Sequence, residues 1–225
     1  MPVLDTTTGQ FVDIRSDGSV PYAILSHTWD AGGKQSYQDV RRIQESSDLR
    51  PRALLQRNWG ACAIAIAENL RFLWIDSSCI DKTSSSELSE AINSMCAWYR
   101  NAVVCYAYLV DVPWAEDLRS EVILLSREWR LVGSKRSLAS LVEEITGIYQ
   151  DILTGGRSLD IISVSRHMSW PSRRSTTRIE DQAYSLLSIF DIVLTPIYGE
   201  GDRAFRRLQE EILRHIPDES IFAWE

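Results

Sequence analysis

Polar side chains that could take part in acid–base or nucleophilic chemistry follow three apolar runs of the sequence. Ser26 and His27 end the first run, Asp76 ends the second and Asp111 ends the third. Open α/β sheets gather functional groups beyond the carboxyl ends of parallel strands, which lie at one edge. We therefore expect these side chains to meet there, with His27 as a candidate general base and a hydrogen-bonded structural histidine as the alternative.

The elements that must position these residues alternate along the first half of the chain. Four apolar runs have the length of buried strands, and they cover residues 22–25, 70–75, 103–110 and 121–125. Helical spacing of apolar residues separates them, over residues 36–46, 53–69 and about 84–100. Such alternation predicts the α/β class, with a mainly parallel sheet flanked by helices. From residue 137 onward the patterns are helical only, so we expect an α/β core over residues 20–126 and a C-terminal helical lobe over residues 127–225 packed on it.

Two further residues near the second strand end could contribute chemistry. Cys79 would be a nucleophile if the fold placed it beside His27, and a buried structural thiol is the alternative. Asp76 and Asp81 flank one loop, where two carboxylates could bind a metal or ribose hydroxyl groups. No third oxygen ligand has calcium-loop spacing, and the three histidines and four cysteines show no zinc spacing. We therefore predict no metal site.

The C-terminal half carries a basic cluster and a glycine pattern. The arginines of the cluster could bind an anion such as phosphate, or form ion pairs within the chain; they are Arg166, Arg173, Arg174 and Arg178, and the acidic candidates are Glu180, Asp181 and Glu200. The glycines of residues 199–204 partly fit a dinucleotide-binding pattern, but a proline precedes them and no βαβ unit follows. A structural turn that starts a helix is the preferred interpretation.

Composition and charge exclude several function classes. The 225 residues include 24 Lys plus Arg and 31 Asp plus Glu, a net charge of −7, which argues against nucleic acid as a partner. The four cysteines form no C-x-x-C pair, and the N-terminus lacks the layout of a signal peptide. Apolar runs are shorter than the ~20 residues that span a bilayer. We expect a soluble, cytoplasmic protein without a membrane span.

Several motifs follow one another in a distinctive order along the chain, at residues 22–29 (YAILSHTW), 73–82 (LWIDSSCIDK), 87–95, 98–102, 168–184 and 198–211. Together they resemble the fungal heterokaryon incompatibility (HET) domain and the region that follows it. The resemblance implies an effector of programmed cell death in fungal allorecognition and innate immunity. It also implies partners: self-association, or other HET or receptor-type proteins.

The HET domain is itself remotely similar to TIR domains, flavodoxin-like modules some of which cleave NAD with a glutamate. NAD is thus a candidate substrate, and no resident cofactor is expected. The site would lie over the strand ends. The catalytic candidates are Ser26, His27, Asp76, Cys79 and Glu116, and the ligand-binding candidates are Trp29, Asp81, Glu90 and Trp98.

One departure from the family pattern leaves enzymatic activity open. Relatives usually carry a segment close to RGWTLQEL after the third strand, which looks like the TIR segment with the catalytic glutamate. Here that segment is absent. Residues 111–120 are followed directly by residues 121–129, which resemble the family sequence downstream of it. The chain is therefore either an active effector or a degenerate, non-enzymatic interaction module. Because ten residues are short for a crossover, we expect the strand at residues 121–125 to be displaced or antiparallel.

Overall fold

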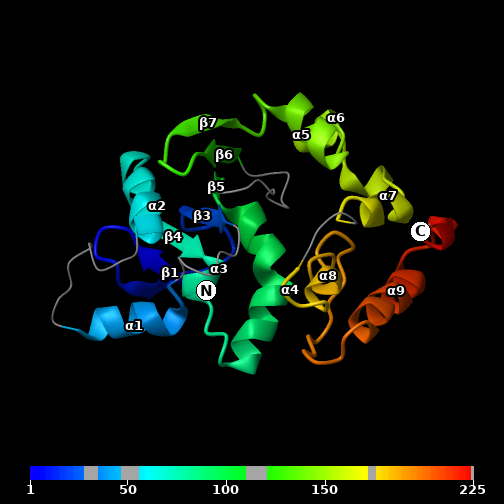
Figure 1. Cartoon of the computed structure of the whole chain (residues 1–225), viewed down its shortest axis with the longest axis horizontal. Coiled ribbons are helices and arrows are strands. Elements are labelled where there is room, and N and C mark those ends of the chain that lie inside the picture. Colours follow the sequence, from blue (N-terminus) through cyan, green and yellow to red (C-terminus); the bar gives the residue numbers. More distant parts are fainter. Residues whose placement is uncertain (28–34, 47–55, 110–120, 172–175, 224–225) are drawn as a thin grey trace. The chain divides into compact units, whose positions relative to one another are not determined.

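The computed structural model describes residues 1–27, 35–46, 56–109, 121–171 and 176–223, which form two compact units (Figure 1). The first unit comprises Met1–Leu88 and Cys96–Leu138, and the second comprises Ser89–Met95 and Ala139–Glu225. The first unit thus reaches beyond residue 126, where we placed the end of the α/β core. The reason is a strand at residues 131–134 that extends the sheet.

The first unit contains one sheet of seven strands in the order β2-β1-β4-β3-β5-β6-β7. The strands are β1 (Pro2–Asp5), β2 (Phe11–Asp13), β3 (Tyr22–His27), β4 (Phe72–Ile75), β5 (Val104–Tyr108), β6 (Glu121–Leu125) and β7 (Leu131–Ser134). Neighbours among β4, β3, β5 and β6 are parallel, whereas β2, β1 and β7 are joined by antiparallel pairing. The α/β class is confirmed, but the sheet is mixed, and parallel pairing is confined to its four central strands.

The position of β6 corrects the expectation of a displaced or antiparallel strand. It pairs in parallel with β5, with Val104 opposite Glu121, and it pairs with β7 on its other side. Because β5 ends at Tyr108 and not at residue 110, the connection has twelve residues, 109–120. A parallel crossover requires about a dozen residues, so this length suffices.

Helices cover both faces of the central strands. Helix α2 (Gln56–Ala67) packs on β4, and the Tyr106 hydroxyl donates to Glu68, just after this helix, over 2.7 Å. On the other face, the ring of Trp74 makes edge contacts with Trp98 and Tyr99 of α4 (Ser85–Asn101). Side chains alternate along a strand, and parallel register aligns neighbours on one face. His27, which is opposite Tyr108, therefore shares the α2 face with Tyr106, whereas Ser26 lies on the α4 face.

Hydroxyl side chains define where two helices of this unit begin. Ser36 and Asp39 form a reciprocal capping box at α1 (Tyr37–Glu45), and the Ser84 hydroxyl accepts from the Glu87 amide at the start of α4. Between β4 and α4 lies the one-turn helix α3 (Asp76–Cys79), against which α1 packs. These caps fix the segments on either side of the strand-end residues.

The second unit is helical around its own apolar core. Its helices are α5 (Ala139–Thr146), α6 (Gln150–Leu153), η2 (Leu159–Ile161), α7 (Val164–Ser169), α8 (Asp181–Tyr184), α9 (Arg203–His215) and η3 (Glu219–Ala223). Helix α9 buries Ala204, Leu208 and Ile212, one side chain per turn, against a core that includes Met168 and Leu186. Residues 185–191, which follow α8, form turns. Within the described residues, no helix is both long and apolar enough to cross a membrane.

Candidate functional site

The carboxyl ends of β3 and β4 bring together a histidine, a carboxylate and a hydroxyl group. His27 is the last residue of β3, and Asp76 and Ser77 follow the neighbouring parallel strand β4 directly. The Ser77 Oγ lies 3.4 Å from the His27 Nε2, and the Asp76 Oδ1 lies 3.7 Å from the His27 Nδ1. We call these three residues the strand-end cluster. The structure thus brings together His27 and Asp76, as expected from their positions after adjacent strands.

The strand-end cluster is largely buried. The His27 side chain is 2% exposed and that of Asp76 is 18% exposed. The Asp76 Oδ1 atom is itself buried and accepts no hydrogen bond from the residues that the structure describes. An unsatisfied buried polar atom costs about 1–3 kcal/mol, more when charged, so native proteins rarely retain one without a functional or structural reason.

A second, fully bonded polar layer lies beside the strand-end cluster. The Ser78 hydroxyl donates to the Gln35 carbonyl oxygen at 2.8 Å and accepts from the Asn58 side chain at 3.0 Å. The Asn58 amide also lies 3.3 Å from the Gln35 Oε1, and all three residues are buried. These bonds tie α2 to α3 on the face of the sheet that carries His27, so they hold the backbone from which Ser77 projects.

Cys79 has the environment of a structural thiol. It is 1% exposed, and its Sγ accepts from the Ile75 backbone amide at 3.4 Å. Burial raises the pKa of the Cys79 thiol to about 12. The thiolate is the nucleophilic form of cysteine, so burial of this kind disfavours the nucleophilic role considered for Cys79.

The other site candidates lie in varied surroundings. The Asp81 Oδ1 accepts from the side chains of Gln38 and Thr83, and the Thr83 hydroxyl bond is the leading cause that lowers the pKa of this carboxyl. Trp98 is 5% exposed and packs in the core against Trp74. Burial and this aromatic contact disfavour a ligand-binding role for Trp98.

The remaining candidates are not part of the strand-end cluster in the described structure. Ser26 is half-buried on the α4 face, and Glu90 is exposed on α4. Trp29 and Glu116 lie outside the described residues. Among the residues that are described, no three His, Cys, Asp or Glu side chains converge on a metal position.

Sequence reasoning did not select Ser77, Ser78, Gln35 or Asn58. The run Asp76-Ser-Ser-Cys79 holds three hydroxyl or thiol side chains, and one helical turn decides which of them faces His27. A polar Asn58 within an otherwise apolar helical stripe was the available signal for the second layer. A buried polar side chain there requires a hydrogen-bonding partner.

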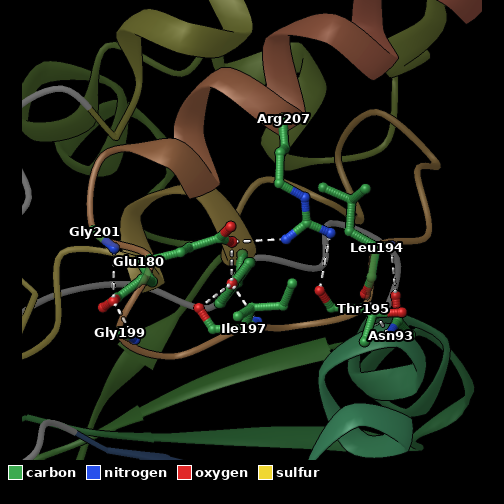
Figure 2. Close-up of polar contacts among 10 residues, drawn as sticks. Asn93, Glu180, Leu194, Thr195, Ile197, Gly199, Gly201 and Arg207 are labelled. Atoms are coloured by element: carbon green, nitrogen blue, oxygen red, sulfur yellow. Dashed lines mark hydrogen bonds and ion pairs between the residues drawn. The ribbon is translucent and has the colours of Figure 1, made fainter.

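The second unit contains a tighter polar network, drawn in Figure 2. The Glu180 Oε1 accepts from the backbone amides of Gly199 at 2.8 Å and Gly201 at 3.1 Å. Hydrogen bonds from the backbone of Glu180 itself, Gly201 and Gly199 lower the pKa of this carboxyl. Both glycines have positive φ, at 99° and 62°, so the turn depends on them. Residues 199–204 thus form a turn leading into α9, whose first residue is Arg203.

Further bonds fix the segment before this turn. The Tyr184 hydroxyl accepts from the Ile197 amide at 2.7 Å and lies 2.9 Å from the Glu200 carboxylate. Arg207 bonds Glu200 at 2.7 Å and the Thr195 carbonyl oxygen at 3.1 Å (Figure 2). We call Glu180, Tyr184, Glu200 and Arg207 the loop network.

Of the arginines proposed for an anion site, two are described with aromatic partners. The Arg178 guanidinium lies 4.5 Å from the centre of the Tyr198 ring, and that of Arg166 lies 5.0 Å from the Tyr149 ring. Arg173 and Arg174 lie outside the described residues. Glu200, one of the acidic partners considered for these arginines, bonds Arg207 instead.

Comparisons with known proteins agree with the motifs. The family described as "Heterokaryon incompatibility protein (HET)" matches residues 22–154, and a domain of unknown function, DUF8212, matches residues 203–225. The vegetative incompatibility protein HET-E-1 of Podospora anserina is 38% identical over 233 residues, which is 89% of this chain and 17% of that protein. The chain therefore spans about a sixth of the length of this curated relative. No solved structure matches the chain at a significant level.

The HET match covers more than half of the chain and includes β3 to β7, with all three residues of the strand-end cluster. The sequence motifs, the α/β unit that carries them and this match lead to one conclusion: the chain belongs to the heterokaryon incompatibility (HET) family of fungal proteins.

Proposed function

We propose that this chain is a cytoplasmic effector module of fungal heterokaryon incompatibility, which triggers cell death after self-association or after binding to another HET or receptor-type protein. The observation that carries the proposal is the match of residues 22–154 to the HET family. The similarity to a vegetative incompatibility protein over 89% of the chain supports it.

The strand order supports a TIR-like, flavodoxin-like core for this module. Across the sheet, the four parallel strands lie in the order β4-β3-β5-β6. If they are numbered 1 to 4 along the chain, this order is 2-1-3-4. Flavodoxin-like folds begin with the same 2-1-3-4 order, and their ligands bind where the first and third strands lie side by side. Here those strands are β3 and β5, and their last residues, His27 and Tyr108, are opposite each other.

The ligand that we propose at this edge is NAD, as a substrate. His27 and Asp76 lie at the carboxyl ends of adjacent strands, where such folds bind nucleotides. A histidine can move a proton at neutral pH, and a carboxylate can accept hydrogen bonds from ribose hydroxyl groups.

A second function is favoured by the departure around residues 111–120. The glutamate-bearing segment of the family pattern is absent there. A chain without that glutamate would be a non-enzymatic module that pairs with complete HET proteins and regulates them. Its fold would serve association and its strand-end cluster would have no role in NAD cleavage.

Expression in a fungal host tests the effector function. We expect expression of the chain to kill or arrest the cells, and healthy cells at a confirmed protein level would contradict the proposal. Exchanging the exposed His215 for Gln provides a matched control for substitutions at His27, because His215 lies on α9 in the other unit.

Incubation of the purified, concentrated protein with NAD separates the two candidates. Release of nicotinamide, followed by chromatography beside a relative that retains the glutamate segment, is expected from an active effector. Release by the relative alone would favour the regulatory module. Co-purification with that relative would then provide its positive test.

A further inference from the structure

The strand-end cluster has the order of groups that activates a serine hydroxyl. The Ser77 Oγ faces the His27 Nε2 at 3.4 Å, and the Asp76 Oδ1 faces the other ring nitrogen, Nδ1, at 3.7 Å. In a Ser-His-Asp triad, the hydroxyl nucleophile contacts one nitrogen of the imidazole, which acts as general base, and a carboxylate that orients the ring contacts the other nitrogen. We propose that Ser77 is a nucleophile for acyl transfer, with His27 as its base and Asp76 as the residue that orients His27. This proposal needs neither NAD nor self-association, so it goes beyond the function proposed above.

The neighbouring serine shows why Ser77 is the candidate. Ser78 is fully buried, and its hydroxyl is engaged with Gln35 and Asn58 at 2.8 and 3.0 Å. Ser77, one position earlier, directs its hydroxyl toward His27. The structure thus distinguishes two adjacent serines: Ser78 holds the backbone, and Ser77 presents its oxygen to a potential base.

The local backbone also suits a nucleophile. Ser77 stands where β4 passes into α3 without an intervening loop. A sharp strand-to-helix junction at the carboxyl edge of a sheet is where α/β hydrolases hold their serine, although the glycines of their G-x-S-x-G motif are absent here. His27 is positioned independently, because its strand pairs with both β4 and β5.

The state of Asp76 supports an orienting role. Its buried Oδ1 accepts no hydrogen bond from the described residues, although the His27 Nδ1 is only 3.7 Å away. Closing this distance by about 1 Å would give a normal hydrogen bond to the N–H of the imidazole. Catalytic hydrogen bonds are often long before substrate binds, and a buried carboxylate gains most when the imidazole becomes charged.

The reaction follows from these positions. Ser77 Oγ attacks the carbonyl carbon of an ester while its proton passes to the His27 Nε2, and a C–O bond forms. The tetrahedral intermediate breaks the bond to the leaving oxygen, which takes the proton from His27 and departs as an alcohol. Water, activated by the same histidine, then releases the acid from Ser77. Because Ser77 is only 6% exposed, the substrate class is small esters.

A small phosphonylating probe tests the proposal with the full chain. Diisopropyl fluorophosphate would form a bond from Ser77 Oγ to phosphorus, break the P–F bond and release fluoride, while the proton passes through His27 to solvent. We expect one adduct per chain by intact mass, located on Ser77 by peptide mapping. The His27→Gln variant should label at least about 100-fold more slowly.

Matched variants keep the outcome interpretable. His215→Gln, on α9 in the other unit, should label at the rate of the unchanged chain. Circular dichroism and thermal unfolding establish that each variant is folded. Absence of an adduct on the folded unchanged chain, an adduct on another residue, or equal labelling of His27→Gln would each overturn the proposal. A Ser77→Ala variant should form no adduct at all, and mapping the adduct on the unchanged chain keeps the test valid if that variant does not fold.

Discussion

The strand-end cluster and the loop network are both buried polar groups around carboxylates, but they differ in how completely their atoms are bonded. In the loop network, bonds of 2.7–3.1 Å satisfy Glu180, Glu200 and Arg207. In the strand-end cluster, contacts of 3.4 and 3.7 Å leave the Asp76 Oδ1 without a hydrogen bond from the described residues.

This difference leads us to propose different roles for the two groups. Each bond of the loop network goes to backbone or to a fixed charge, so it holds residues 195–201 in one conformation. In the strand-end cluster, the buried Asp76 Oδ1 accepts no hydrogen bond from the described residues, and buried groups of this kind, which cost stability, are common at active sites. We therefore propose that the loop network serves folding and that the strand-end cluster serves function.

The largest expected effect is a loss of reactivity at the strand-end cluster without a loss of stability. Asp76→Asn should slow phosphonate labelling of Ser77 by about 100-fold or more, because the amide orients the imidazole less well and does not stabilise its charged form. The free energy of unfolding, from urea denaturation, should change by no more than about 1 kcal/mol, because the buried Asp76 Oδ1 accepts no hydrogen bond from the described residues that the substitution would remove. A loss of stability without slower labelling would reverse the assignment.

The opposite behaviour is expected of Tyr184 in the loop network. Tyr184→Phe removes the acceptor of the Ile197 amide and the partner of Glu200. The Ile197 amide would then lack this acceptor, whereas Glu200 would keep its bond with Arg207, so the free energy of unfolding should fall by about 1–3 kcal/mol, measured by urea denaturation. Labelling of Ser77 should not change. A variant as stable as the unchanged chain would show that the network does not support the fold.

The pH dependence of stability offers a smaller, directional test of the loop network. The lowered pKa of Glu180 means that its stabilising contribution is complete above the ordinary glutamate pKa and is lost as the pH falls through the folded-state value. Glu180→Gln should therefore be less stable than the unchanged chain at neutral pH. The difference in stability between the two proteins should become smaller as the pH falls. Thermal unfolding measured from pH 7 to pH 3 would show this change. A constant difference over this range would contradict the assignment.

The smallest effect is expected at Ser26, which precedes His27 but lies on the opposite face of the sheet. Ser26→Ala should leave the labelling of Ser77 unchanged and alter the free energy of unfolding by no more than about 0.5 kcal/mol. A marked loss of labelling would show that the reactive face has been assigned incorrectly. In that case the α4 face would need the same examination.

The sequence predicted the central strands because each is a continuous apolar run. It did not reveal β1, β2 or β7, which have only three or four residues; β7 exposes Leu131 and Val132 at the edge of the sheet. Short edge strands gain their structure from pairing with a formed sheet, which a local pattern does not encode. For the same reason the mixed character of the sheet emerged only from the structure.

The candidate site was predictable to the level of the strand ends. Parallel neighbours place His27 beside Asp76, so their proximity follows from the order of strands. The orientation of the single turn at residues 76–79 does not follow, and it decides that Ser77 faces the histidine while Cys79 turns into the core. The loop network depends on contacts between residues up to 21 positions apart, which no local spacing indicates.

The most direct test compares cell killing by one variant from each region. His27→Gln and Tyr184→Phe would be expressed beside the unchanged chain in a fungal host, at equal levels of folded protein. The account predicts that Tyr184→Phe kills as the unchanged chain does, whereas His27→Gln is harmless. Killing by His27→Gln at the full rate would contradict the assignment of function to the strand-end cluster.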